Sequence, residues 1–400
     1  HWLGMGAFLC APVRSQLVSR AGNQHVRVGG AMMQGFREEM EDAHCICLGL
    51  EGHPDVAFYG VYDGHSGDKV SKHLAKELHH RIAKLGPDFE DEALQKAVIK
   101  LDLEVGRSEI RNNGSTCVFV LVRPLTGAAS CNGQSSEKGE IAWRISAFNV
   151  GDSRAMLVRA NGTLVDLTKD HKPSNRQEAA RIRKAGGFVQ NDRTDGELAM
   201  SRAIGDFKYK LNPELSELDQ KVIALPDVMH EVARPGDRLL VICDGVVEQL
   251  TNKEVASFVH SNMKHNKSDP AMLMRELLFH SLRSGSTDNH SAILVCFGYD
   301  GTEYAAPDVF MPGPLGPARQ DPKFVAAYIK NAEAWGQKRE ALPKLIAEAE
   351  ASMPRDWKQE SQPSSDWSTS AIRILLSVVF LILAYYAVFE VGWGSRDGED

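Results

Sequence analysis

The sequence predicts an α+β fold in which β-sheets are flanked by helices that come in pairs. Two observations lead to this class: predicted strands mostly follow predicted strands along the chain, and the helical segments occur two at a time. A fold of alternating βαβ units would instead show strand and helix taking turns. The 400 residues suffice for one large domain or two ordinary ones.

The first strands and helices lie between residues 42 and 111. Runs rich in β-branched and aromatic residues predict strands at 42–50 and 56–63. Apolar residues at helical spacing then predict helices over 67–85 and 88–111. The first helix pair therefore follows the first strand pair.

The rest of this region repeats the arrangement. Apolar runs predict further strands at 115–122, 145–150, 155–159, 163–167, 238–243 and 291–297. Helices are expected at 173–185, at 251–263 and from 269 onwards. Asn161-Gly162 is a strong signal for a type I′ hairpin, and Thr251 with Glu254 forms a capping-box pattern.

Composition excludes some classes of function. Hydrophobic residues make up 43% and charged residues 25%, as in a folded globular protein. The net charge is 46 − 53 = −7 without a dense basic stripe, which argues against nucleic-acid binding. Seven irregularly spaced cysteines predict free thiols in a reducing compartment. His44, Cys45 and Cys47 are read as strand residues in preference to part of a zinc site.

Shifts in composition divide the chain into five segments. We expect an N-terminal extension at 1–23, a globular domain at 24–300 and a linker at 301–370 that contains a helical stretch near 322–351. A membrane anchor at 371–393 and a short acidic tail at 394–400 follow. Pro343 is expected to kink or split the linker helix. Within the extension, Gly6 after Met5 resembles a myristoylation site, although Cys10 stands where Ser or Thr is usual.

The anchor prediction rests on an uncharged stretch near the C-terminus. Ile374–Phe389 contains 16 residues without charge, and the apolar run reaches Trp393 if Glu390 is tolerated at the far interface. A membrane span needs roughly 20 apolar residues, so the length is marginal but usable. Because apolar residues cover every face, a span is favoured over a buried amphipathic helix. Arg373 would keep the large domain on the cytosolic side.

Acidic residues follow or precede several predicted strands. They are Glu41, Asp42, Asp63, Asp152, Asp244 and Asp288. Carboxylates without a Cys/His set favour hard divalent cations such as Mg²⁺ or Mn²⁺. A single Asp-Gly pair is more often a turn, but Asp63-Gly64 and Asp244-Gly245 both follow apolar strands. Pattern alone therefore leaves metal binding only somewhat ahead of a structural role.

Six motifs occur in an order that resembles the metal-dependent protein phosphatases of type 2C. They are MQGFREEMEDAH, VYDGHSG, GDSR, LAMSRAIGD, CDGVVE and STDNHSAIL, spread over residues 27–298. The resemblance implies a four-layer α/β/β/α sandwich of two antiparallel sheets with a helix pair on each outer face. Val246-Val247 departs from the family's usual aromatic residue after the metal-binding Asp-Gly, which removes no ligand.

The resemblance also implies two bound Mg²⁺ or Mn²⁺ ions. Asp63 matches the aspartate that bridges them, and Gly64 the residue that offers a backbone carbonyl. Asp244 and Asp288 match the other direct ligands. Two metals that share a carboxylate can activate a bridging water for attack on phosphorus.

The remaining matched residues surround that centre. Glu41 matches a metal-site acid, Asp42 a neighbour that acts through water, and Asp152 a ligand of a weaker third metal shared with Asp244. Arg37 matches the residue that holds the substrate phosphate, since a guanidinium offers a bidentate fork. His65 matches the general acid that protonates the leaving oxygen. The SRAIGD segment (201–206) is expected to shape the edge of the site.

The resulting expectation is a membrane-tethered phosphatase that removes phosphate from phosphoserine and phosphothreonine of protein substrates, with a monomeric catalytic domain. A rival from another class is a pseudophosphatase that serves as a membrane-anchored binding module. Loss of a metal aspartate would favour that rival, and none is lost. A metal-dependent phosphodiesterase is a more distant alternative, which phosphodiester turnover would reveal.

Overall fold

Two antiparallel β-sheets form the body of the protein in the computed structural model, which describes residues 8–125, 141–263 and 269–352. The larger sheet has the strand order β10 (Leu164–Asp166), β9 (Arg154–Val158), β15 (Arg238–Ile242), β16 (His290–Phe297), β2 (Val26–Arg37), β1 (Phe8–Gly22) and β17 (Ala306–Met311). The smaller has the order β14 (Asp227–Ala233), β8 (Trp143–Val150), β7 (Cys117–Pro124), β4 (Ala57–Tyr62) and β3 (Ala43–Cys47).

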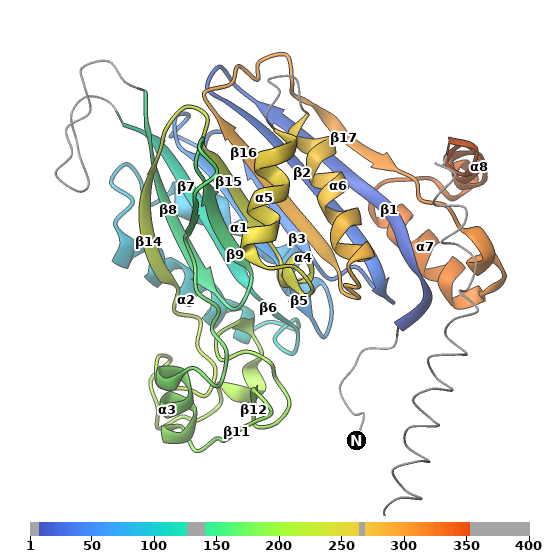
Figure 1. Cartoon of the computed structure of the whole chain (residues 1–400). Coiled ribbons are helices and arrows are strands. Elements are labelled where there is room, and N and C mark those ends of the chain that lie inside the picture. Colours follow the sequence, from blue (N-terminus) through green and yellow to red (C-terminus); the bar gives the residue numbers. More distant parts are fainter. Residues whose placement is uncertain (1–7, 126–140, 264–268, 353–400) are drawn as a thin grey trace, which may run out of the picture.

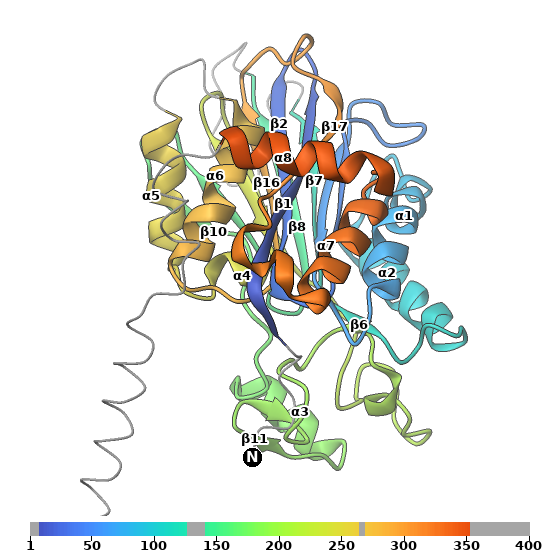
Figure 2. The ribbon, with the colours of Figure 1, turned by 90° about the vertical axis from the view of Figure 1, so that its right-hand side faces the viewer.

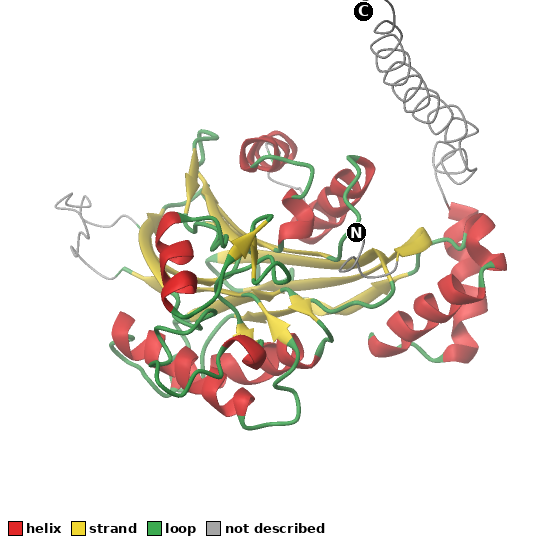
Figure 3. Cartoon of the chain, turned by 90° about the horizontal axis from the view of Figure 1, so that it is seen from below, coloured by secondary structure: helices red, strands yellow, loops and turns green. Residues whose placement is uncertain are grey.

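A helix pair covers the outer face of each sheet (Figures 1 and 3). Helices α1 (Lys69–Ala83) and α2 (Asp91–Gly106) pack on the smaller sheet, and α5 (Asn252–Asn262) and α6 (Pro270–Arg283) on the larger. The predicted four-layer α/β/β/α class is therefore confirmed. The predicted capping box at Thr251 and Glu254 is also formed.

Strand β4 shows how the layers hold together. All six of its residues are buried. Phe58 and Tyr62 join the apolar cluster beneath α1 and α2, whereas Tyr59 and Val61 point into the cluster between the sheets. Because successive side chains of a strand face opposite ways, one short strand is fixed by two cores. Its end is therefore held rigidly.

Smaller elements lie at one end of the sandwich. A three-stranded sheet is formed by β13 (Ile204–Gly205), β6 (Gly114–Ser115) and β5 (Gly64–His65). Below it, helix α3 (Arg176–Lys184) and the pair β11 (Val189–Gln190) and β12 (Arg193–Thr194) form a projecting segment (Figure 1). Helix α3 begins three residues later than predicted, so Pro173 lies before the helix.

The larger sheet reaches beyond both ends of the globular domain predicted at 24–300. Strand β1 starts at Phe8 and pairs with β2, so most of the supposed extension belongs to the larger sheet. After residue 300, β17 adds to the free edge of β1. Helices α7 (Pro322–Ala334) and α8 (Leu342–Ser352) follow, and α7 covers β1 (Figure 2).

The C-terminal helices partly match their prediction. The expected helical stretch at 322–351 is interrupted after α7, the 3₁₀ helix η3 (Arg339–Ala341) leads into α8, and Pro343 is the second residue of α8. Proline is well tolerated there because the first turn of a helix lacks backbone acceptors for its N–H groups. Helix α7 buries Phe324 and Tyr328 against Leu9 and Val13 of β1.

Two predictions fall outside the described residues: the acylation site at Gly6 and the membrane anchor at 371–393. Within the described ranges, none of the helices is long and apolar enough to cross a membrane. The six cysteines that lie there are free, as expected.

Candidate dimetal active site

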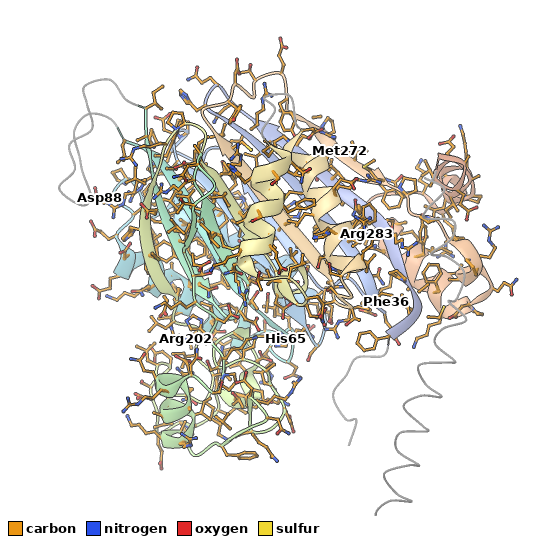
Figure 4. The ribbon with its side chains drawn as sticks, viewed as in Figure 1. Phe36, His65, Asp88, Arg202, Met272 and Arg283 are labelled. Carbon is orange, nitrogen blue, oxygen red and sulfur yellow. The ribbon has the colours of Figure 1, made fainter. Side chains whose placement is uncertain are left out.

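The predicted metal-binding aspartates lie where strands of the two sheets end. Asp63 directly follows β4, and Asp244 opens the short helix α4 (Asp244–Val247) just after β15. Asp288 lies two residues before β16, and Asp152 two residues after β8. Figure 4 shows His65, which lies two residues after Asp63, at this end of the sandwich.

The electrostatic interactions of Asp63 indicate that four other carboxylates lie near it. Burial raises the pKa of Asp63 well above its ordinary value, and the charges of Asp42, Asp244, Asp288 and Asp152 raise it further. Burial, followed by the charge of Asp152, likewise raises the pKa of Asp244 to about 8. Several carboxylates buried together without enough positive charge are unfavourable, and a bound cation would relieve that cost.

Two carboxylate oxygens in this cluster have unused acceptor capacity. Oδ1 of Asp42 and Oδ1 of Asp152 are buried and have no hydrogen-bond partner. The other oxygen of Asp42 accepts a hydrogen bond from Ser291 at 2.7 Å. Buried polar atoms are normally paired, so unpaired acceptors among carboxylates fit a site built for hard cations.

The side chains do not form a closed cage. Over the described parts of the chain, no group of three or more His, Cys, Asp or Glu side chains has the arrangement of a ready-made metal site. Mg²⁺ commonly keeps several waters and takes only one or two carboxylates. An open set of aspartates completed by water therefore still suits the predicted ions, whereas the result gives no support to a zinc site at His44, Cys45 and Cys47.

Thr116 and Ser153 hold the backbone of Asp63, a role the sequence analysis missed. The N–H of Asp63 donates to Oγ1 of Thr116 at 3.0 Å, and the N–H of Thr116 donates to the carbonyl of Asp63 at 2.9 Å. Oγ1 of Thr116 also lies 2.7 Å from Oγ of Ser153. Both hydroxyl side chains are fully buried. Asp63 is thus fixed independently of any ion.

Glycines allow the backbones around the centre to approach closely. A Cβ on Gly64 would lie 2.2 Å from the carbonyl oxygen of Glu41, and one on Gly245 would lie 2.0 Å from that of Asn289. Either substitution would push apart two segments that carry acidic residues. The Gly in each Asp-Gly pair therefore has a packing role beside any role in a turn.

Arg37 ends strand β2 and contacts one of the predicted ligands. Its Nε lies 2.8 Å from Oδ1 of Asp288. Burial lowers the pKa of Arg37, but the charges of Asp288, Asp63 and Glu41 outweigh that effect and the pKa is raised. The guanidinium therefore stays charged at the rim of the carboxylate cluster.

Glu41 lies in the loop between β2 and β3, which Asn289 ties to the start of β16. The backbone N–H of Gly67 donates to the Glu41 side chain, and burial raises the pKa of Glu41. Asn289 accepts from the N–H of Glu41 at 2.8 Å, and its Nδ2 donates to the carbonyls of Gln34 at 2.8 Å and Glu39 at 3.0 Å. One buried amide thus links the Arg37–Glu41 loop to Asp288.

His65 has a partner that sequence reasoning did not assign. Its Nε2 lies 2.6 Å from Oδ2 of Asp206, and its side chain is mostly buried. Burial lowers the pKa of His65, but the charge and hydrogen bond of Asp206 outweigh it and the pKa is raised. A Cβ on Gly114 would lie within 2.3 Å of both side chains, so they are closely packed. The SRAIGD segment shapes the site edge through Asp206.

Asp152 differs from the simple expectation of a third-metal ligand. Nζ of Lys172 lies 2.6 Å from Oδ2 of Asp152. Burial lowers the pKa of Lys172, but Asp152 outweighs it and the pKa is raised. The Lys172 ammonium already offsets the negative charge of Asp152. A third metal ion would therefore have to bind beside Lys172 or displace it. Val247, which stands where the family usually has an aromatic residue, is partly buried and packs against the main core.

Comparison with known proteins matches this architecture to a family. A family model described as Protein phosphatase 2C matches residues 26–290. A probable protein phosphatase 2C of Caenorhabditis elegans is 35% identical over 305 residues, which cover 73% of this chain and 80% of that protein. The chain belongs to the protein phosphatase 2C family.

Other members of the family extend the likeness. Protein phosphatase 1A of Homo sapiens is 34% identical over 313 residues, covering 73% of this chain and 76% of that protein. The solved structure of a phosphatase from a pathogenic strain of Toxoplasma gondii has a TM-score of 0.64 at 30% identity and covers 74% of this chain and 99% of that one. The predicted enzyme class, a protein-serine/threonine phosphatase, is confirmed at the level of the family.

Proposed function

We propose that this phosphatase 2C chain hydrolyses phosphoserine and phosphothreonine in proteins by attack of a water activated by two Mg²⁺ or Mn²⁺ ions. The observation that carries the proposal is the group of buried and half-buried aspartates around Asp63, whose mutual repulsion a bound cation would relieve. Asp63, Gly64, Asp244 and Asp288 would hold the two ions, with Glu41 and Asp42 acting beside them. Bound metals would lower the pKa of water and offset charge that develops on the phosphoryl group.

Two of the chain's own side chains would handle the substrate. Arg37 contacts Asp288 through Nε, which suits a phosphate bound by the two terminal nitrogens of the guanidinium. His65 carries a raised pKa and would donate a proton to the serine or threonine oxygen as it leaves. Asp206 would hold the imidazole in place during that transfer.

The test is release of phosphate from a phosphothreonine peptide by the purified protein. We expect turnover with Mn²⁺ or Mg²⁺, loss of it with chelator, recovery on adding metal back, and at least a hundredfold loss in Asp244→Ala. Full activity in chelator would overturn the dimetal mechanism. Bound metal with near-absent turnover would favour the pseudophosphatase, and faster turnover of phosphodiesters would favour the phosphodiesterase.

We also propose that residues 371–393 anchor the enzyme in a membrane with the catalytic domain in the cytosol. The support is the uncharged run Ile374–Phe389 preceded by Arg373. Deleting residues 371–400 should move the protein from the membrane fraction to the soluble fraction of a cell lysate. A full-length chain that is already soluble without detergent would contradict the anchor.

A further inference from the structure

Helix α7 contacts the loop that follows the phosphate-binding arginine. Nζ of Lys330 lies 2.5 Å from Oε1 of Glu39, and Lys323 contacts the carboxylate of Glu38. Glu38 and Glu39 are the two residues directly after Arg37. Phe36, which precedes Arg37, lies at the end of the sheet nearest α7 (Figure 4). A helix outside the family-model match at 26–290 thus reaches the active-site loop.

The helix that carries these lysines is firmly placed. Phe324 and Tyr328 are each 1% exposed and pack against β1. The hydroxyl of Tyr328 donates to the carbonyl of Gly313 at 3.0 Å, and Asp321 caps the helix by accepting from the N–H of Lys323 at 2.8 Å. The two lysines are seven residues apart, which places both on one side of the helix.

The loop is therefore held from two directions. On the side of the metal site, Nδ2 of Asn289 donates to the carbonyl of Glu39 at 3.0 Å. On the other side, the Glu39 carboxylate meets Lys330. At the base of the loop, Arg37 pairs with Phe8, where β1 begins. The position of Arg37 thus depends on the N-terminal strand and on α7 as well as on the family core.

The positive charges of Lys323 and Lys330 suggest what their contacts with the loop do. A phosphate dianion bound by Arg37 would lie near two carboxylates that repel it, and the lysines of α7 offset both negative charges. The side chains of Lys323 and Lys330 are 53% and 65% exposed, so these ion pairs stabilise the fold little. Their effect should instead fall on the affinity for an incoming anion.

We infer that Lys323 and Lys330 of α7 are positioning residues that keep the Arg37 loop in place and neutralise it for the substrate phosphate. This inference rests on the proposed phosphatase function. It makes the C-terminal helix part of substrate binding without placing any of its side chains on the reacting atoms.

The test is a charge swap across the Lys330–Glu39 pair. In the full-length protein with Mn²⁺, K330E should lower kcat/KM for a phosphothreonine peptide by about three- to tenfold, mainly through a higher KM. E39K alone should also lower it, because two ammonium groups would then face each other and the loop would lose its contact with α7. The double variant K330E/E39K should return to within about twofold of wild type.

A matched control lies at the end of the same helix. Glu333 pairs with Arg339 at 2.8 Å, and both side chains are exposed. R339E makes the same change of net charge without touching the loop, so it should leave kcat/KM unchanged. The K330E loss should also shrink on raising the salt from about 50 mM to about 500 mM, because exposed charges are screened.

Each outcome decides between the proposals. Equal behaviour of K330E and R339E, or no recovery in the double variant, would overturn the inference. A salt-independent loss accompanied by a lower unfolding temperature would assign Lys330 a purely structural role, which also overturns it. A wild-type protein without metal-dependent turnover would instead overturn the proposed function, and the inference with it.

Discussion

Thr116 binds the backbone of Asp63 at both of its hydrogen-bonding groups, accepting from the N–H at 3.0 Å and donating to the carbonyl at 2.9 Å. The proposed bridging aspartate is therefore oriented by a fully buried threonine that contributes no carboxylate. Rigid support of this kind is what a metal ligand needs to keep its geometry when the ion leaves.

The first prediction concerns one of these two hydrogen bonds, the one that the Thr116 hydroxyl accepts from the N–H of Asp63. Thr116→Val keeps the side-chain shape but leaves the N–H of Asp63 and the hydroxyl of Ser153 without their partner. We expect a loss of about 1–2 kcal/mol in the free energy of unfolding and about tenfold weaker Mn²⁺ activation. Urea unfolding and a Mn²⁺ titration of activity measure the two effects. Thr116→Ser, which keeps the hydroxyl, should behave nearly as wild type, and equal defects in both variants would argue against the hydrogen bond.

The second prediction concerns the contact between His65 and Asp206. Asp206→Asn preserves size but removes the charge that holds the imidazole. Turnover of a phosphothreonine peptide should fall about tenfold or more, because a serine or threonine oxygen leaves poorly without a proton. An aryl phosphate, whose leaving group is already a good one, should be affected much less. Equal losses on both substrates would show that Asp206 supports the site in general and not the acid.

That contact also marks the limit of sequence reasoning. His65 and Asp206 lie 141 residues apart and meet because β5 and β13 both pair with β6. Asp206 itself has a positive φ of 54°, and this backbone conformation cannot be predicted from the pattern of residues around it. The acidic residues were predictable as candidates because most of them lie close to an apolar strand, and their roles were predicted from the resemblance to type 2C phosphatases. Their supporting residues were not, because a Thr or an Asn near a strand has many ordinary uses.

Strand β1 was missed for a related reason. Its sequence carries Ser15, Gln16 and Ser19 at buried positions, so no apolar alternation is visible. These side chains lie where the strand is covered by its neighbours in the sheet and by α6 and α7. Periodicity predicts a strand only when one of its faces is apolar, and that condition held for β4 and β7 but failed for β1.

The third prediction concerns acid stability and Glu178 of α3. Burial raises its pKa, but Arg202 and Arg181 outweigh that effect and lower the pKa to about 2. Since the unfolded value is about 4.3, this carboxylate contributes stability above about pH 4.3 and loses it as the pH falls towards 2. E178Q should cost about 2–4 kcal/mol at neutral pH, and the cost should shrink in acid.

Urea unfolding of wild type and E178Q at neutral and acid pH checks this dependence. Glu217→Gln, a change at an exposed position outside the ion pairs of Glu178, provides the control and should leave stability unaltered at either pH. A cost of E178Q that stays constant with pH would mean that shape and hydrogen bonding, and not the charge of Glu178, hold Arg181 and Arg202.

The fourth prediction separates stability from activity at the metal site. Asp244 is half-buried, and the charges of Asp152 and Asp288 repel its carboxylate when no cation is bound. In chelator, Asp244→Asn should therefore unfold with about 1–3 kcal/mol more free energy than wild type, because it removes one buried charge. On addition of Mn²⁺ the order should reverse: wild type gains stability from the bound ion, and the variant gains little.

Asp269→Asn, which changes a partly buried aspartate paired with Arg20 far from the centre, should be destabilised in both conditions. If Asp244→Asn were the less stable protein in chelator, repulsion among these aspartates would not be the force that a metal relieves, and the argument for a cation at Asp63 would lose its physical basis.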